Sequence, residues 1–198
     1  WPELAKAIAY RIVADTRIQG DQPAEKIRRY EAALTDAPEE IAPVLETLLA
    51  GAYRDYFQQN RWRLLQRTRT SETSGGDFET WDLPRLFREI DERYRAALEN
   101  AVTLQQIPIA DYDTLLVKGT VPDSFRPTLY DFLAHQALAF YTAAEQAGAA
   151  PQDVFRFDAK SPALGTRAEF LDWKPDSTDT DSPTLRAVLL YQDLLRFH

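Results

Sequence analysis

The sequence contains no cysteine. This absence excludes disulfide bonds, thiol nucleophiles and cysteine-based zinc sites within these residues. No apolar run approaches the roughly 18 residues that a membrane-spanning helix requires, and the pattern of a secretory signal peptide does not occur. Because the chain begins with Trp1 and not with methionine, we expect it to be a processed product or a fragment of a much longer chain.

Positive charge is also in short supply. The 198 residues include 23 Lys and Arg against 31 Asp and Glu, which gives a formal net charge of −8. General nucleic-acid binding depends on cations that displace counterions from phosphates, and anionic membrane surfaces attract basic segments. We therefore expect neither nucleic-acid binding nor direct membrane insertion. The expected partners are proteins or further domains of a parent chain.

The common patterns of catalytic and metal sites are missing as well. Gly119 lacks the preceding glycine and the Gly-Lys order of a Walker sequence, and there is no G-x-S-x-G nucleophile elbow. Asp179 and Asp181 alternate in "DSTDTDSP", but the glycine and glutamate of an EF-hand loop do not follow. A solvated loop that leads to a helix cap at Ser182 explains this segment better. Carboxylates in "PEE" and "IDER" are expected to be solvated on helix faces, so we predict no catalytic residue, metal or cofactor.

One Asp–His pair requires separate consideration. Asp131 and His135 are four residues apart in "LYDFLAHQALAFY" and share a helix face. An aspartate can orient a histidine as a general base, but the sequence supplies no nucleophile for it. Both residues lie mostly opposite the apolar side of the helix, so the favoured interpretation is a local pair on the helix surface, and we predict that the chain is not an enzyme.

Helical patterns dominate the chain, and strand signals are weak. Apolar residues recur at helical spacing, and proline stands near several helix starts. Predicted helices cover residues 2–18, 21–35, 36–59, 82–101, 126–148 and 181–198, with Asp36, Asp82 and Ser182 as N-caps, and one further turn of helix is expected in "TRAEFLDW". The sequence thus predicts an all-α fold with about six main helices and long loops.

Two arrangements of these helices are open. Tight links between the first helices favour stacked helical hairpins of the tetratricopeptide-like kind, although no clean 34-residue period is present. The alternative is an irregular helical bundle. We expect a single domain over residues 1–198, with a subdivision into 1–67 and 82–198 as the alternative, because Gly, Ser and Thr dominate residues 68–80.

A cluster of arginines follows the third predicted helix. Arg61, Trp62, Arg63, Arg67 and Arg69 lie in "NRWRLLQRTRT". Arginine forks around an aromatic ring are suited to an anion or a protein partner. Arginines near a helix C-terminus also complement its negative end, and the chain offers many acidic neighbours. This second interpretation is favoured, and it predicts that Trp62, Leu64 and Leu65 are buried under the arginine stems.

Five stretches, taken in order, resemble a known family. They are "AYRDYFQQNRWRLLQRTRT", "FETWDLPRLFREI", "LQQIPIADYDTLL", "FRPTLYDFLAHQALAFY" and "RAVLLYQDLLRFH". Together they resemble the N-terminal helical region of large alpha-2-macroglobulin-like proteins of Bacteroidota-type bacteria. The resemblance extends from about residue 45 to the end of the chain.

The resemblance implies an extracytoplasmic parent protein, periplasmic or anchored as a lipoprotein, in which this region precedes macroglobulin-like β-domains. Proteins of the wider family are similar to protease traps, and many carry a thioester in a Cys-x-Glu-Gln motif. That motif cannot lie here, because the chain has no cysteine. The expected function is a non-catalytic scaffold or docking domain of a protease inhibitor. The alternative is an independent binding module for a peptide or an acidic glycan.

Overall fold

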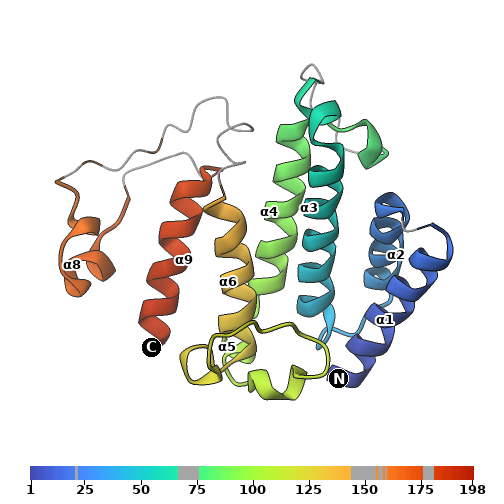
Figure 1. Cartoon of the computed structure of the whole chain (residues 1–198). Coiled ribbons are helices and arrows are strands. Elements are labelled where there is room, and N and C mark those ends of the chain that lie inside the picture. Colours follow the sequence, from blue (N-terminus) through green and yellow to red (C-terminus); the bar gives the residue numbers. More distant parts are fainter. Residues whose placement is uncertain (21, 67–75, 144–154, 156–157, 159, 176–180) are drawn as a thin grey trace. The chain divides into compact units, whose positions relative to one another are not determined.

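The computed structural model describes residues 1–20, 22–66, 76–143, 155, 158, 160–175 and 181–198. Within this part the fold is all-helical, with eight α-helices, six of them seven residues or longer, and no strand (Figure 1). The predicted all-α fold with about six main helices is confirmed. No helix among these residues combines the length and the apolar character needed to cross a membrane.

The helices predicted over residues 2–18, 21–35, 82–101 and 181–198 begin and end within three residues of the predicted positions, whereas the one predicted over residues 126–148 begins at Leu129 and ends at Tyr141. The α-helices are α1 (Pro2–Ile18), α2 (Pro23–Thr35), α3 (Ala42–Gln66), α4 (Leu83–Leu98), α5 (Ala101–Leu104), α6 (Leu129–Tyr141), α8 (Arg167–Asp172) and α9 (Pro183–Phe197). Short 3-10 helices are η1 (Phe78–Thr80), η2 (Ile109–Tyr112), η3 (Asp123–Phe125) and η4 (Pro162–Leu164).

Side-chain caps set the start of α4 and of α9, as the sequence predicts. The Asp82 carboxylate accepts a hydrogen bond from the Arg85 amide at 2.9 Å, and the Ser182 hydroxyl accepts one from the Leu185 amide at 3.3 Å. Each bond satisfies one of the amides that a helix start leaves without an intrahelical partner.

The third helix differs from its predicted bounds at both ends. It starts at Ala42, because Asp36 is the C-cap of α2 and not the N-cap of α3. It also continues beyond residue 59 through a kink at Asn60, where φ is −109° and ψ is 15°. The Asn60 side-chain amide donates to the Tyr56 carbonyl at 2.9 Å. This bond gives the Tyr56 carbonyl a donor at the kink, and the helix bends there without ending.

The chain forms two compact units, Trp1–Leu133 and Ala134–His198, and the division falls within α6. In the first unit consecutive helices pack on one another, α1 on α2, α2 on α3 and α3 on α4 (Figure 1). Stacked helical hairpins produce such an arrangement. Because α3 and α4 flank residues 68–80 and pack together, both belong to this unit. The single domain over residues 1–198 stays a prediction, as does its alternative of two parts.

An aromatic cluster holds the segment before α4 against α3. The Phe78 ring meets Tyr53 and Tyr56 edge-to-face, with centroids 5.7 and 5.4 Å apart, and Trp81 stacks on Tyr53 at 5.9 Å. Aromatic pairs in these geometries contribute roughly 0.5–1.5 kcal/mol beyond the area they bury. The cluster therefore fixes where α4 begins relative to α3.

In the second unit, side chains of α9 hold the end of α8. The buried Gln192 amide donates to the carbonyls of Phe170 and Trp173, at 2.6 and 2.9 Å. Arg196 donates to the Leu171 carbonyl at 3.0 Å. The last carbonyls of a helix have no intrahelical donor, so α9 supplies the donors that α8 itself lacks.

Candidate functional site

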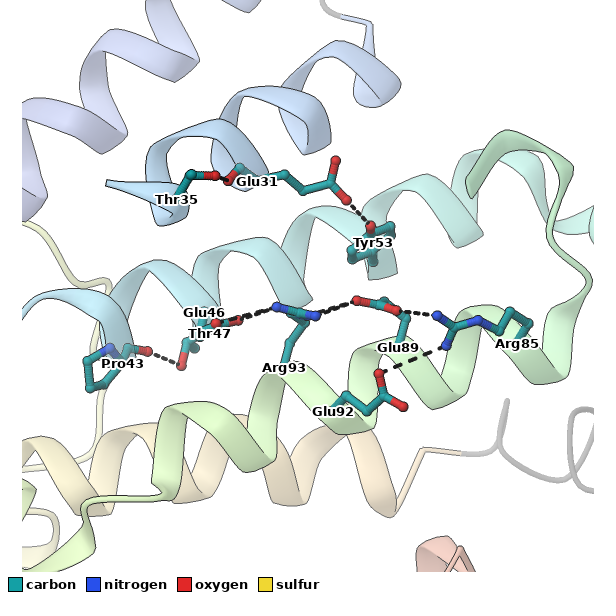
Figure 2. A network of polar contacts seen from close by, with 10 residues as sticks. All are labelled: Glu31, Thr35, Pro43, Glu46, Thr47, Tyr53, Arg85, Glu89, Glu92 and Arg93. Atoms are coloured by element: carbon teal, nitrogen blue, oxygen red, sulfur yellow. Dashed lines mark hydrogen bonds and ion pairs between the residues drawn. The ribbon is translucent and has the colours of Figure 1, made fainter. Parts of the chain in front are cut away.

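The α3–α4 interface of the first unit contains a connected set of charged side chains (Figure 2). Arg93 lies between two glutamates: its Nη1 is 3.2 Å from Glu46 Oε2, and its Nη2 is 2.8 Å from Glu89 Oε1. The other oxygen of Glu89 accepts from Arg85 Nη2 at 2.8 Å. Glu89 is only 6% exposed. We call Glu46, Arg85, Glu89 and Arg93 the interhelical charge network.

The spacing along α4 explains this geometry. Arg85, Glu89 and Arg93 follow one another at intervals of four residues, so they occupy one helix face, and the face points toward α3 (Figure 2). The guanidinium carbon of Arg85 also lies 4.5 Å from the centre of the Trp81 ring. This network was not predicted from the sequence. The alternation of charge at four-residue intervals was the signal available.

Burial and charge shift the acidity of the network. Burial raises the pKa of Glu46 above its ordinary value, although Arg93 acts in the opposite direction and Glu89 adds to the increase. The pKa of Arg93 is also raised, because the attraction of Glu46 and Glu89 outweighs the effect of burial. Arg93 therefore stays cationic at neutral pH and is held between two carboxylates.

The pKa values of two buried tyrosines of the first unit, Tyr53 and Tyr30, are raised as well. Tyr53 donates its hydroxyl to Glu31 Oε1 at 2.6 Å, which links α3 to α2 (Figure 2). Burial raises the pKa of Tyr53, and this hydrogen bond raises it further. Burial also raises the pKa of Tyr30 to about 12, with a smaller contribution from Asp55. Both hydroxyls therefore stay protonated at neutral pH. The Tyr53 hydroxyl serves as a hydrogen-bond donor to Glu31, and Tyr30 is a buried residue of α2.

The network has the features of a structural site. The carboxylates and guanidiniums of the network are within hydrogen-bonding distance of one another, which is how buried charges are normally tolerated. Among the residues that the structure describes, no group of three or more His, Cys, Asp and Glu side chains could hold a metal ion. The arrangement joins α3 to α4 through the ion pair between Glu46 and Arg93.

Asp131 lies elsewhere than the sequence predicts. It is fully buried, so the expectation that it lies on the helix surface is wrong. Its Oδ2 accepts from the amide and the hydroxyl of Thr128, at 3.0 and 2.8 Å, and Thr128 Oγ1 accepts from the Asp131 amide at 3.3 Å. This reciprocal arrangement is a capping box at the start of α6. His135, one turn later, is partly exposed.

The arginine-rich stretch also differs from its favoured interpretation. Trp62 is 80% exposed and Leu65 is 47% exposed, whereas Leu64 is 2% exposed. The prediction of burial is therefore correct for Leu64 and wrong for Trp62 and Leu65. With Leu64 facing the core, Trp62 is rotated by about 200° on a helix of 3.6 residues per turn and faces outward.

The arginines beside Trp62 do not meet the acidic neighbours that were expected. Arg63 donates to the Tyr56 hydroxyl, and its guanidinium lies 5.8 Å from the centre of that ring. Within the described part of the chain, neither Arg61 nor Arg63 forms an ion pair. Arg67 and Arg69 lie outside the described residues, as does Asp179, whereas Asp181 is exposed next to the Ser182 cap.

Comparisons with known proteins give no relative for this chain. No protein-family model matches the sequence, and no significant match occurs among curated proteins or solved structures.

Proposed function

We propose that this chain is a non-catalytic helical scaffold and docking domain. The observation that carries the proposal is the interhelical charge network, in which Arg93 of α4 pairs with Glu46 of α3 and with Glu89 of its own helix. The Asp131–His135 pair leads to the same proposal, since Asp131 takes part in the capping box at the start of α6. Carboxylates engaged in this way support packing and leave little for acid–base chemistry.

The resemblance to alpha-2-macroglobulin-like proteins extends this proposal to a parent protein. In that proposal the helical domain precedes β-domains in an extracytoplasmic, periplasmic protein, and the protease-inhibiting activity belongs to those other domains. Consecutive helices α1 to α4 pack on one another within the first unit, and repeat domains that bind proteins over extended surfaces also pack their helices in sequence order. Protein–protein interaction is the role that this architecture supports.

An immunoblot of fractionated source cells, with an antibody raised against this domain, tests the parent. We expect a band far larger than the 22.6 kDa of this chain in the periplasmic or membrane fraction. Protease inhibition by the whole protein would be measured next, and the variant His135→Ala should leave it unchanged. A band near 22.6 kDa in the cytosol would contradict the macroglobulin-like parent.

A further inference from the structure

We propose that the exposed end of α3 is a docking site for an acidic, leucine-containing segment of a partner protein. The site consists of Arg61, Trp62, Arg63 and Leu65, which we call the α3-end surface. This inference deepens the docking part of the proposed function and rests on it. It does not depend on the identity of the parent protein.

Local geometry places Arg61, Trp62 and Leu65 on one side of the helix, with Arg63 at its edge next to Trp62. Trp62 and Leu65 are three residues apart and Arg61 and Leu65 are four apart, so they are neighbours on the helix surface. Leu64 faces the other way and is buried. The burial of Leu64 thus fixes the orientation of α3 after the kink, and this orientation exposes Trp62.

Trp62 is the feature that requires an explanation. A tryptophan side chain exposes a large apolar area, in the range of 150–250 Å² for aromatic residues, and 80% of Trp62 is open to solvent. By contrast, Trp81 and Trp173 are partly covered within their units. Tryptophan and arginine are the residue types most enriched at the energetic centres of protein–protein interfaces. A partner that covers Trp62 and Leu65 would remove this apolar area from water.

The charge of the surface indicates the chemistry of the partner. The sequence has no acidic residue between Asp55 and Glu72, although the whole chain carries a net charge of −8. Arg93 is held by two carboxylates of the chain itself, whereas the partner of Arg63 is the uncharged hydroxyl of Tyr56. Arginines without an acidic partner can bind carboxylates through paired hydrogen bonds. The surface therefore complements a segment rich in Asp or Glu.

Two other anionic partners fit less well. A nucleic acid presents a long line of phosphates. Those that extend past the α3-end surface would be repelled by the rest of the chain, which carries a net charge of −8. An acidic glycan could stack a sugar on Trp62, but it has no aliphatic side chain to cover Leu65. An acidic peptide with a leucine can pair with the arginines and cover both apolar side chains.

Fluorescence anisotropy with labelled peptides tests the inference. The probe alternates pairs of glutamates with single leucines, and a second peptide has glutamine in place of every glutamate. Trp62→Ala and Arg61→Gln remove the apolar and the charged contact. Phe125→Ala and Arg17→Gln are matched controls, because each removes an exposed residue of the same kind outside the surface. Far-UV circular dichroism and thermal unfolding of each variant report the fold.

We expect the glutamate peptide to bind and the glutamine peptide to bind at least tenfold more weakly. Trp62→Ala should weaken binding about 30-fold, as expected of an interface hot spot, and Arg61→Gln about fivefold, with stronger salt screening of the latter contact. The two controls should bind as the unaltered chain does. All variants should keep the circular dichroism spectrum and melting temperature of the unaltered chain.

Three results would overturn the inference. The first is no binding of the glutamate peptide at the highest protein concentration that stays in solution. The second is equal binding by the unaltered chain and Trp62→Ala. The third is tight binding of heparin oligosaccharides, lost in the same variants, with no binding of the peptide; this would identify a glycan site. None of these results bears on whether the charge network stabilises the scaffold, which thermal unfolding of Arg93→Met measures separately.

Discussion

Arg93→Met is the sharpest test of the scaffold. The substitution keeps an unbranched stem of similar length that can pack as the arginine stem does, and it removes the cation from between Glu46 and Glu89. Breaking a buried ion pair costs about 3–5 kcal/mol, because one charge is left without compensation. Here Glu89 keeps its bond to Arg85, and Arg93 is itself partly exposed. We therefore expect the free energy of unfolding to fall by about 2–3 kcal/mol.

Urea unfolding followed by far-UV circular dichroism at pH 7 measures this change. Arg95→Met is the matched control, because Arg95 lies on the exposed side of α4 and is 4.0 Å from Asp91. An exposed pair of this kind contributes about 0–1 kcal/mol. If Arg93→Met costs no more than Arg95→Met, the interhelical network is energetically equivalent to surface charge, and the reasoning from burial fails.

A second substitution separates loss of the cation from loss of packing. In Arg93→Met the carboxylate of Glu46 stays partly buried without its main partner, so Glu46→Gln added to this variant should restore roughly 1 kcal/mol. In the unaltered chain Glu46→Gln also removes the ion pair with Arg93, so it should be less favourable there than in Arg93→Met. If Glu46→Gln has the same effect in both backgrounds, Glu46 and Arg93 are not coupled.

Four further predictions follow from the same contacts. The pKa of Glu46 is raised in the folded state, so ionisation of this side chain opposes folding. In urea titrations the unaltered chain should therefore lose stability relative to Glu46→Gln as the pH rises from the ordinary glutamate pKa through the raised one. Tyr30, with a pKa of about 12, should form tyrosinate late in an absorbance titration, and the stability it contributes should be lost as pH rises from about 10 to about 12. Asp131→Ala should cost about 1–2 kcal/mol, and Asp131→Asn less, because the amide oxygen still accepts from Thr128. Gln192→Leu should cost about 1–3 kcal/mol and raise hydrogen exchange in α8, whereas an unchanged exchange rate would show that α8 does not depend on this side chain.

The parts of the fold that sequence predicts well are those set by neighbouring residues. Asp82 and Ser182 cap their helices because side chain and amide are three positions apart, with proline already favouring the first turn. The start of α3 was misplaced because Asp36 is the C-cap of α2, although an acidic side chain locally favours the start of a helix. The continuation of α3 past Asn60 depends on the burial of Leu64, which is a tertiary contact.

The charge network illustrates a limit of a different kind. A helix face with alternating Arg and Glu is stable in water, and the sequence cannot say whether a second helix covers it. The contact that makes the network interhelical is the one between Glu46 of α3 and Arg93 of α4, which are 47 residues apart in the sequence. The same local pattern would be ordinary surface charge if α3 presented an apolar residue at that position.

Asp131 and Trp62 show that the polarity of a residue does not by itself predict whether its side chain lies on the buried or the exposed side of a helix. The sequence does contain the capping signal at α6, since Thr128 and Asp131 have the spacing of a capping box. The predicted side of the helix was wrong for Asp131 because, in the first turn, capping bonds decide where a polar side chain lies.

No comparable local signal exists at Trp62. Leu64 and Leu65 are both apolar, and either could have faced the core. At about 100° per residue, Trp62 lies about 160° from the core direction when Leu64 faces the core, and would lie only about 60° from it if Leu65 did. The choice of Leu64 exposes the ring, and this choice creates the surface that we propose binds an acidic partner.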